Sequence, residues 1–497
     1  MLKRIALIFF FFIVALSCAD LDVENLNKPD SDDILTHEFI TNYASDLHRL
    51  WFNRTQGFIS PALNLAVHAD QLTCSWSSWW YFGMEPREQW NNKETYKYEW
   101  VTRYIWETLY DVFNVGTDIL QFLSSEKGNE MEESEKKMLT AWSNFNMGIS
   151  LGYIALIFDR GFINTDDAGS FSPGLAPWYE LIPVSIQYLD ECIEICNDYS
   201  FELPDNYIAG TNYTSKELAK LSNTFAARII AYSPRNATQN DTLDWARVLQ
   251  YATNGIDFNY EVGQLDDPFW GDYYIRFCIR NNWFRIDHRI INLLDPGYPH
   301  HFPSENIWPE DISKEATSSD ARLLSDFRYW SSYWSIACPF RPERGYYHWS
   351  YYSYDRYSYM WAGGGFQGDI PLILKWENDL LIAEALIRAN NDLAGAIAIL
   401  NDPEGPRKTR GGLEDIPIGS GIEDILDAIF YERDIELLAT GMGVPFFDMR
   451  RRDMLQTGSL LHFPLPGGDL NILGIDYYTF GGEENADGIN TSNGGWF

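Results

Sequence analysis

Apolar residues recur along much of this chain at alternating spacings of three and four, which is the period of one face of an α-helix. Stretches of this kind cover residues 134–158, 178–198, 217–232, 243–254, 375–390 and 392–401. Ser134 is a plausible N-cap of the first stretch, and Asn254 with Gly255 resembles the end of a helix. In chain order the stretches form three pairs, and helix pairs of roughly 30 to 40 residues are typical of tetratricopeptide-like repeats. The pattern predicts a mainly all-α fold.

The helical period is interrupted between the second and third pairs. Residues 257–368, called here the loop-rich block, are dense in Tyr, Trp, Pro and Gly and show little helical period. We expect long ordered loops there, with a few short strands or helices. Because the repeats continue on both sides, residues 34–497 are predicted to form one domain, whose helical part covers about 34–256 and 369–455.

Residues 1–17 have the features of a signal peptide. Lys3 and Arg4 precede an apolar run over residues 5–16, which is shorter than the roughly 18 residues needed to span a bilayer. The run ends in Ala-Leu-Ser-Cys at positions 15–18, which resembles a bacterial lipobox, so Cys18 is predicted to be lipidated. Cleavage by ordinary signal peptidase is the alternative. The acidic residues 18–33 indicate a solvated tether between this anchor and the domain.

The charge of the chain narrows its possible partners. It has 71 Asp and Glu against 37 Lys and Arg, for a formal net charge of −34. Because no excess of positive charge is present to neutralise phosphates, nucleic acid is excluded as a partner. The hydrophobic content of 45% is enough to bury a large core, which argues against disorder.

The aromatic residues gather in two places without a helical stripe. Four Trp and a Tyr lie between residues 76 and 90, and residues 345–361 hold nine rings. Flat rings beside polar side chains are suited to stacking against the C–H faces of sugar rings, although core or interface packing also uses them. The candidate ligand-binding residues are Trp76, Trp79, Trp80, Tyr81, Trp270, Trp283, Tyr346, Trp349 and Tyr351.

Other chemical motifs are weak. Residues 363–368 match a Gly-x-Gly-x-x-Gly pattern, yet no βαβ unit surrounds them, so no nucleotide cofactor is predicted. The eight His are scattered, and we expect no metal site. Cys192 and Cys196, four apart on a helix, are expected to be small core residues instead of a disulfide. Glu432 and Glu436 could supply a carboxylate pair for glycoside hydrolysis.

Several segments of the C-terminal half together resemble one known family. They are Pro-Leu-Ile-Leu-Lys-Trp at 371–376, Leu-Leu-Ile-Ala-Glu-Ala at 380–385, Tyr-Glu-Arg-Asp-Ile-Glu-Leu at 431–437, Phe-Asp-Met-Arg-Arg at 447–451 and Phe-Pro-Leu-Pro at 463–466. The chain resembles the SusD/RagB outer-membrane lipoproteins in these segments. With the lipobox, the resemblance extends over essentially the whole mature chain.

The resemblance implies a binding protein without catalysis. Members of that family are tetratricopeptide-like helical proteins, anchored through a lipidated Cys to the cell surface of Gram-negative bacteria. They capture oligomers, most often glycans, for a SusC-like TonB-dependent transporter. Glu432, Arg433, Asp448 and Arg450 match motif positions that are expected to be scaffold. Two alternatives stay open: a secreted glycoside hydrolase that uses Glu432 and Glu436, and a peptide-capturing member of the same family.

Overall fold

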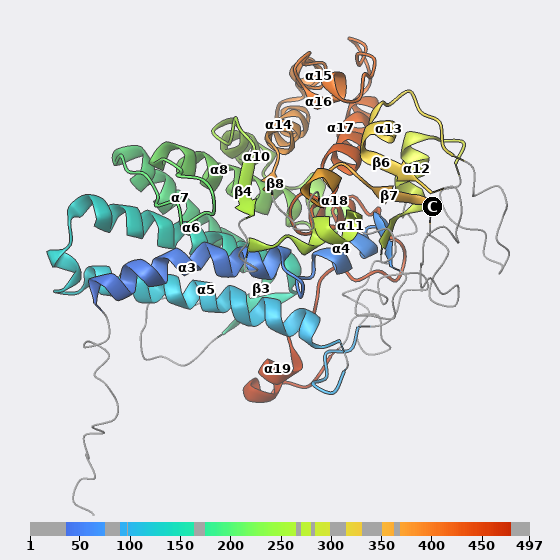
Figure 1. Ribbon diagram of the computed structural model, residues 1–497. Helices are drawn as coiled ribbons and strands as arrows, with labels where there is room; N and C mark the ends of the chain where they lie inside the picture. Colours follow the sequence, from blue (N-terminus) through green and yellow to red (C-terminus); the bar gives the residue numbers. More distant parts are fainter. Residues whose placement is uncertain are drawn as a thin grey trace, which may run out of the picture.

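The computed structural model describes residues 36–74, 90–96, 98–163, 174–264, 270–279, 284–298, 315–330, 350–361 and 368–478, and all structural statements concern these residues. The fold is mainly α-helical, as the sequence predicted (Figure 1). The long helices are α3 (His37–Gln56), α5 (Trp100–Ser124), α6 (Glu133–Ile157), α7 (Trp178–Asp198), α8 (Ser215–Tyr232), α14 (Lys375–Asn390) and α17 (Ile422–Glu436). The shorter helices of the helical part are α4 (Ala62–His68), α9 (Ala237–Asp241), α10 (Trp245–Thr253), α15 (Leu393–Leu400), α16 (Pro406–Thr409), α18 (Val444–Arg450) and α19 (Gly467–Leu473).

The helices pack in the order of the chain. α3 lies against α5, α5 against α6, α6 against α7, and α7 against α8, so that the first half forms a layered array (Figure 1). α10 contacts both α8 and α14, and α14 contacts α15 and α17. The second half of the helical part is therefore joined to the first through α10, although the loop-rich block separates them in sequence.

The six predicted helical stretches agree with α6, α7, α8, α10, α14 and α15 to within two residues at each end. The predicted cap at Ser134 is wrong. Glu132 holds the N-cap position with extended backbone and Ser134 lies in the first turn. The pattern of apolar residues did not predict α3, whose buried face includes His48, Thr55 and Gln56 beside its apolar residues.

In the part of the chain that the structure describes, the strands are short and pair antiparallel in four two-stranded sheets. The pairs are β1 (Leu72–Cys74) with β5 (Phe284–Ile286), β2 (Arg160–Phe162) with β3 (Leu175–Pro177), β4 (Tyr260–Gln264) with β8 (Gly368–Ile373), and β6 (Phe327–Tyr329) with β7 (Tyr352–Tyr354). The described part of the loop-rich block also contains α11 (Tyr273–Ile279), α12 (His288–Leu294) and α13 (Arg322–Asp326). Short 3₁₀ turns cover Gly128–Glu130 and Ser358–Trp361.

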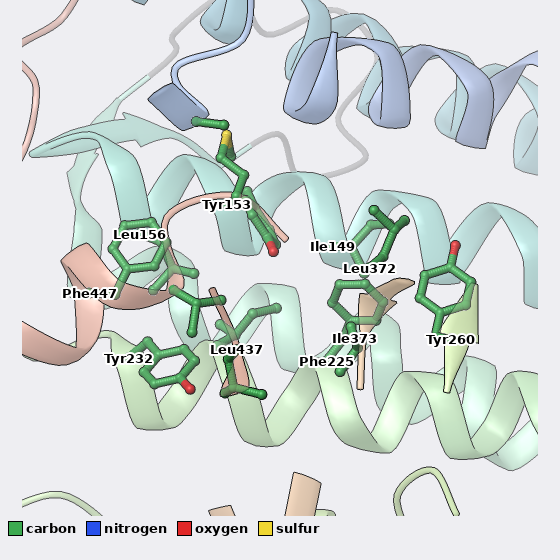
Figure 2. Packing of buried hydrophobic residues seen from close by; sticks show 14 of the residues in the cluster. Ile149, Tyr153, Leu156, Phe225, Tyr232, Tyr260, Leu372, Ile373, Leu437 and Phe447 are labelled. Atoms are coloured by element: carbon green, nitrogen blue, oxygen red, sulfur yellow. The ribbon is translucent and has the colours of Figure 1, made fainter. Parts of the chain in front are cut away.

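One continuous core joins the helices to the β4–β8 sheet. Figure 2 shows side chains of α6 facing those of α8, with residues of β4, β8 and α18 beside them. Tyr153, Phe225 and Tyr260 are each at most 1% exposed. Because a protein interior is packed as densely as an organic crystal, this core fixes the position of the β4–β8 sheet relative to the helical part.

Cys192 and Cys196 are free, buried thiols on α7, with their sulfur atoms 3.8 Å apart. The prediction that they are small core residues is confirmed. None of the helices in the described ranges is both long and apolar enough to cross a bilayer.

The crossing of α6 and α7 depends on Gly148. Ser185 Oγ of α7 donates a 2.7 Å hydrogen bond to the carbonyl oxygen of Gly148, and a Cβ on Gly148 would lie 2.8 Å from Leu189 Cγ. Gly148→Val is therefore expected to lower the free energy of unfolding by about 2 kcal/mol through overpacking, measured by denaturant titration. Gly174→Val is the matched control, since an added Cβ there meets no atom within 4 Å. Equal stability of the two variants would contradict this account of the crossing.

Candidate functional site

The loop-rich block is held to the helical part by a buried arginine, Arg322, at the start of α13. Its guanidinium lies 2.7 Å from Asp320, 2.8 Å from Glu432 and 3.1 Å from Glu436. The side chains of Arg322 and Glu432 are 0% exposed. Because both glutamates belong to α17, this cluster fixes α13 against that helix.

Further arginines fix the other end of α13. Arg410 donates to Asp326, the last residue of α13, at 2.7 Å to Oδ1. Arg410 also lies 3.2 Å from Glu436, and Arg356 lies 2.8 Å from the same carboxylate. Strand β6 follows Asp326 directly, so the buried ion pairs also set the position of β6.

The strand β6 and its partner β7 bring aromatic side chains together at the protein surface. Tyr329 pairs with Tyr352 across the sheet, and their ring centroids are 5.4 Å apart. The backbone N–H of Trp330 donates to the carbonyl oxygen of Tyr351 at 2.9 Å, and Trp330 Nε1 donates to Ser353 Oγ at 2.9 Å. Tyr352 is buried, whereas Tyr329, Trp330 and Tyr351 are partly exposed. These three residues are called the aromatic surface below.

Charged groups border the aromatic surface. The guanidinium of Arg328 lies 4.3 Å from the Trp330 ring centroid, and that of Arg285 lies 5.6 Å from it. Both distances are within the range of cation–π attraction, which holds the indole in place. A cavity of about 290 Å³ lies beside these residues and is lined in part by Glu315, Tyr329 and Asp355.

The tyrosines of this region stay protonated at neutral pH. Burial raises the pKa of Tyr352 to about 12, and burial also raises the pKa of Tyr329 and of Tyr351. Their hydroxyls can therefore donate as well as accept hydrogen bonds. The arrangement combines flat apolar faces with donors and carboxylate acceptors at the edge, which suits a small ring that has apolar C–H faces and hydroxyls at its rim.

Two of the nine predicted ring residues lie in the described residues. Tyr351 is part of the aromatic surface. Trp270 is only 4% exposed, with its ring centroid 5.2 Å from that of Phe52, so its packing is that of a core residue. The others lie outside the described residues, as does Cys18: Trp76, Trp79, Trp80, Tyr81, Trp283, Tyr346 and Trp349.

Sequence reasoning did not single out Tyr329, Trp330 or Arg328. They lie in the loop-rich block, but their short run of Arg-Tyr-Trp is less dense in rings than residues 345–361. The available signal was a short polar and aromatic segment directly after a helix, which is a plausible start of a strand. Conversely, Trp90 is the last residue of the first ring cluster in the sequence, but its side chain is fully buried and packs against Phe463.

The motif residues of α17 and α18 are scaffold, as expected. Arg433 is 2% exposed and pairs with Glu384 and Asp448. Arg450 donates to the carbonyl oxygens of Leu156 and Tyr232, at the ends of α6 and α8. Within the described part of the chain, no cluster of three or more His, Cys, Asp or Glu side chains is placed to hold a metal ion.

The fold is that of SusD-like proteins. A SusD homologue of Bacteroides thetaiotaomicron matches with a TM-score of 0.59 at 15% identity, over 89% of this chain and 98% of that chain. A surface glycan-binding protein A of Bacteroides uniformis matches with a TM-score of 0.58 at 13% identity, over 89% and 99%. A SusD-like carbohydrate-binding protein of Bacteroides vulgatus matches with a TM-score of 0.55 at 16% identity, over 83% of each chain. No protein-family model matches the sequence, and no curated protein matches it either.

Proposed function

We propose that this protein is a non-catalytic binding protein of the cell surface, which captures oligosaccharides and delivers them to a SusC-like TonB-dependent transporter in the outer membrane. The observation that carries the proposal is the aromatic surface, presented on a short sheet that buried ion pairs hold in place. Two proteins with this fold are described as carbohydrate-binding and surface glycan-binding, which supports the same ligand class.

The proposal includes attachment of the protein to the membrane through its N-terminal segment. Lipidation of Cys18 would attach the mature chain to the membrane, with residues 18–33 as the tether. Stable attachment needs more than one acyl chain, because the net charge of −34 gives no attraction to an anionic bilayer. Residues 34–497 would then act as one binding domain above the transporter.

Catalysis by Glu432 and Glu436 is not favoured by their surroundings. Both carboxylates are buried and share the guanidinium of Arg322, so neither faces a space that a sugar could enter. A glycosidase needs its two carboxyl groups to flank the scissile bond of a bound sugar instead.

One experiment distinguishes a glycan-binding protein from a glycoside hydrolase. The chain from residue 19 onward would be incubated with a panel of neutral and acidic polysaccharides, and retardation in native gels and new reducing ends would both be measured. Retardation by at least one polysaccharide without release of reducing ends supports the proposal. Catalytic release of sugar would establish a hydrolase, and retention of peptides in place of every glycan would indicate a peptide-capturing protein.

The aromatic surface is tested by Trp330→Ala. We expect at least about a tenfold loss of affinity for the retained glycan, because central rings of a binding site dominate its energy. The melting temperature should stay nearly unchanged, since Trp330 is partly exposed. Tyr179→Ala removes a ring that is 59% exposed on α7 and is the control. Trp79→Ala and Trp349→Ala test the ring clusters of the sequence in the same assay. Unchanged affinity of Trp330→Ala would exclude the aromatic surface as the glycan site.

A further inference from the structure

A second cavity lies on the helical part and is lined by residues of α7, α8 and α10. Figure 1 shows where these three helices lie. The volume of the cavity is about 720 Å³, and no residue of the aromatic surface lines it. Each of the three helices contributes residues spaced by three, four or seven positions, so that one face of each helix borders the cavity. We call it the helical groove.

The helical groove is locally cationic in an acidic protein. Lys216, Lys220 and Arg247 line it together with a single acid, Asp190. Lys220 lies 2.6 Å from Asp257, and Arg247 lies 3.7 Å from Asp190. Lys216 has no ion-pair partner within the described ranges, and it is exposed. Lys216 and Lys220 are four positions apart on α8, and such a like-charged pair destabilises a helix by a few tenths of a kcal/mol. Positive charge is therefore left available for an anion.

Carboxamide groups make up much of the remaining lining, at Asn197, Asn223, Gln250 and Asn254. Asn223 is only 7% exposed, and its Nδ2 donates to the carbonyl oxygen of Ala219 at 2.8 Å. No group in the described part of the chain donates to its Oδ1. A carboxamide offers a donor and an acceptor side by side, which is the pattern that adjacent sugar hydroxyls complement.

The lining of the helical groove also includes one aromatic ring, that of Tyr251, which makes two hydrogen bonds within the groove. Tyr251 donates to Asp190 Oδ1 at 2.7 Å and accepts from Arg247 Nη2 at 3.2 Å. These bonds hold the phenol and the guanidinium in one place. The lining thus combines cations, amides and one aromatic ring in a space of the size that short oligosaccharides and other small ligands occupy.

We propose that the helical groove is a second binding site, specific for an acidic saccharide, that is, a short sugar chain with carboxylate groups. The inference rests on the proposed function and extends it by naming a second site and a ligand charge. A chain with a net charge of −34 repels acidic ligands, but this repulsion is screened beyond roughly 8 Å at physiological ionic strength. A local group of cations is then sufficient to hold a carboxylate, while the amides bind the hydroxyls.

The test is calorimetric titration of the chain from residue 19 onward with a trimer of galacturonic acid and with the neutral trimer of galactose. We expect the acidic trimer to bind more tightly than the neutral one, and its affinity to fall as salt is added. Lys216→Glu should weaken the binding of the acidic trimer by about fivefold or more, because a favourable charge contact becomes a repulsive one. Lys93→Glu makes the same charge change at an exposed residue outside the groove and should have no effect.

The two proposals can fail separately. If Lys216→Glu binds the acidic trimer like the unchanged protein, or if the acidic trimer does not bind, the helical groove is not such a site, whatever the aromatic surface does. If Trp330→Ala removes binding of the acidic trimer, the ligand lies at the aromatic surface and the helical groove is likewise excluded. Binding that Lys216→Glu weakens and Trp330→Ala leaves unchanged supports the groove, even where the gel assay finds no retained polysaccharide.

Discussion

Arg322→Met is expected to lower the free energy of unfolding by about 4 kcal/mol, because it removes the buried cation that three buried carboxylates share. Arg322 is fully buried and lies within 3.1 Å of Asp320, Glu432 and Glu436. Methionine fills a similar volume but neutralises none of them. The loss should be measured by chemical denaturation at neutral pH.

The same variant should also weaken glycan retention, because α13 leads directly into β6 and its aromatic residues. Arg103→Met on α5 is the matched control: Arg103 makes surface ion pairs with Glu99 and Glu107, and its removal should lower the free energy of unfolding by less than about 1 kcal/mol and leave glycan retention unchanged. A stable Arg322→Met protein would show that the ion pairs of Arg322 are not needed to hold α13 against α17.

The period of apolar residues predicted six helices, including α8 and α14, whose buried faces also hold polar residues, but it did not predict α3. The six predicted stretches bury mainly aliphatic and aromatic residues, so their period is visible. In α3 the buried face includes His48, whose Nδ1 is 3.0 Å from Asn146 Oδ1 of α6, and Trp142 Nε1 donates to the carbonyl oxygen of Ala44. Asn146 and Trp142, the partners of His48 and of the Ala44 carbonyl, each lie 98 positions away, which no local pattern reveals.

The burial of aromatic residues is also hard to predict from the sequence. Trp90 and Trp330 both lie in segments without helical period, and sequence alone gives no reason to separate them. Trp90 is buried because Phe463, from the far end of the chain, packs against it. Trp330 stays partly exposed because it follows a short strand at the protein surface. Ring density along the sequence therefore does not separate buried rings from partly exposed ones.

The role of the acidic residues of α17 depends on partners that are distant in the sequence. Glu432 and Glu436 are four positions apart, a spacing that suits either an exposed helix face or a pair of catalytic carboxylates. Both are buried instead, because Arg322 and other arginines reach them from segments more than twenty positions away. The family resemblance had implied a scaffold role for Glu432, and the contacts supply its physical reason.

A second buried cluster joins α14 to α18 and makes the fold sensitive to acid. Glu384 and Asp448 share the charges of Arg433 and Arg451, and both carboxylates are at most 2% exposed. Burial alone would raise the pKa of Asp448, but the charges of Arg452, Arg451 and Arg433 outweigh it and lower this pKa to about 2. Burial is outweighed in the same way at Glu384, whose pKa is held well below its ordinary value by Arg451 and Arg433.

These lowered pKa values predict loss of stability in acid. A carboxyl group whose pKa is lower in the folded state binds its proton more readily when unfolded, so it stabilises the fold above its unfolded pKa and less as the pH falls. Between about pH 5 and pH 2 the contribution of Asp448 alone should fall by about 2 kcal/mol. Denaturant titrations across this range should show a free energy of unfolding that decreases steadily toward acid.

Asp448→Asn separates this effect from general acid unfolding. At pH 7 the variant should be less stable by about 3 kcal/mol, because buried arginines lose a charged partner. The difference should shrink toward pH 2, where Asp448 itself takes up a proton and loses its charge. Asp427→Asn, on the exposed side of α17, is the control and should differ from the unchanged protein by a small, nearly constant amount. A difference for Asp448→Asn that stays constant from pH 7 to pH 2 would mean that Asp448 does not supply this acid sensitivity.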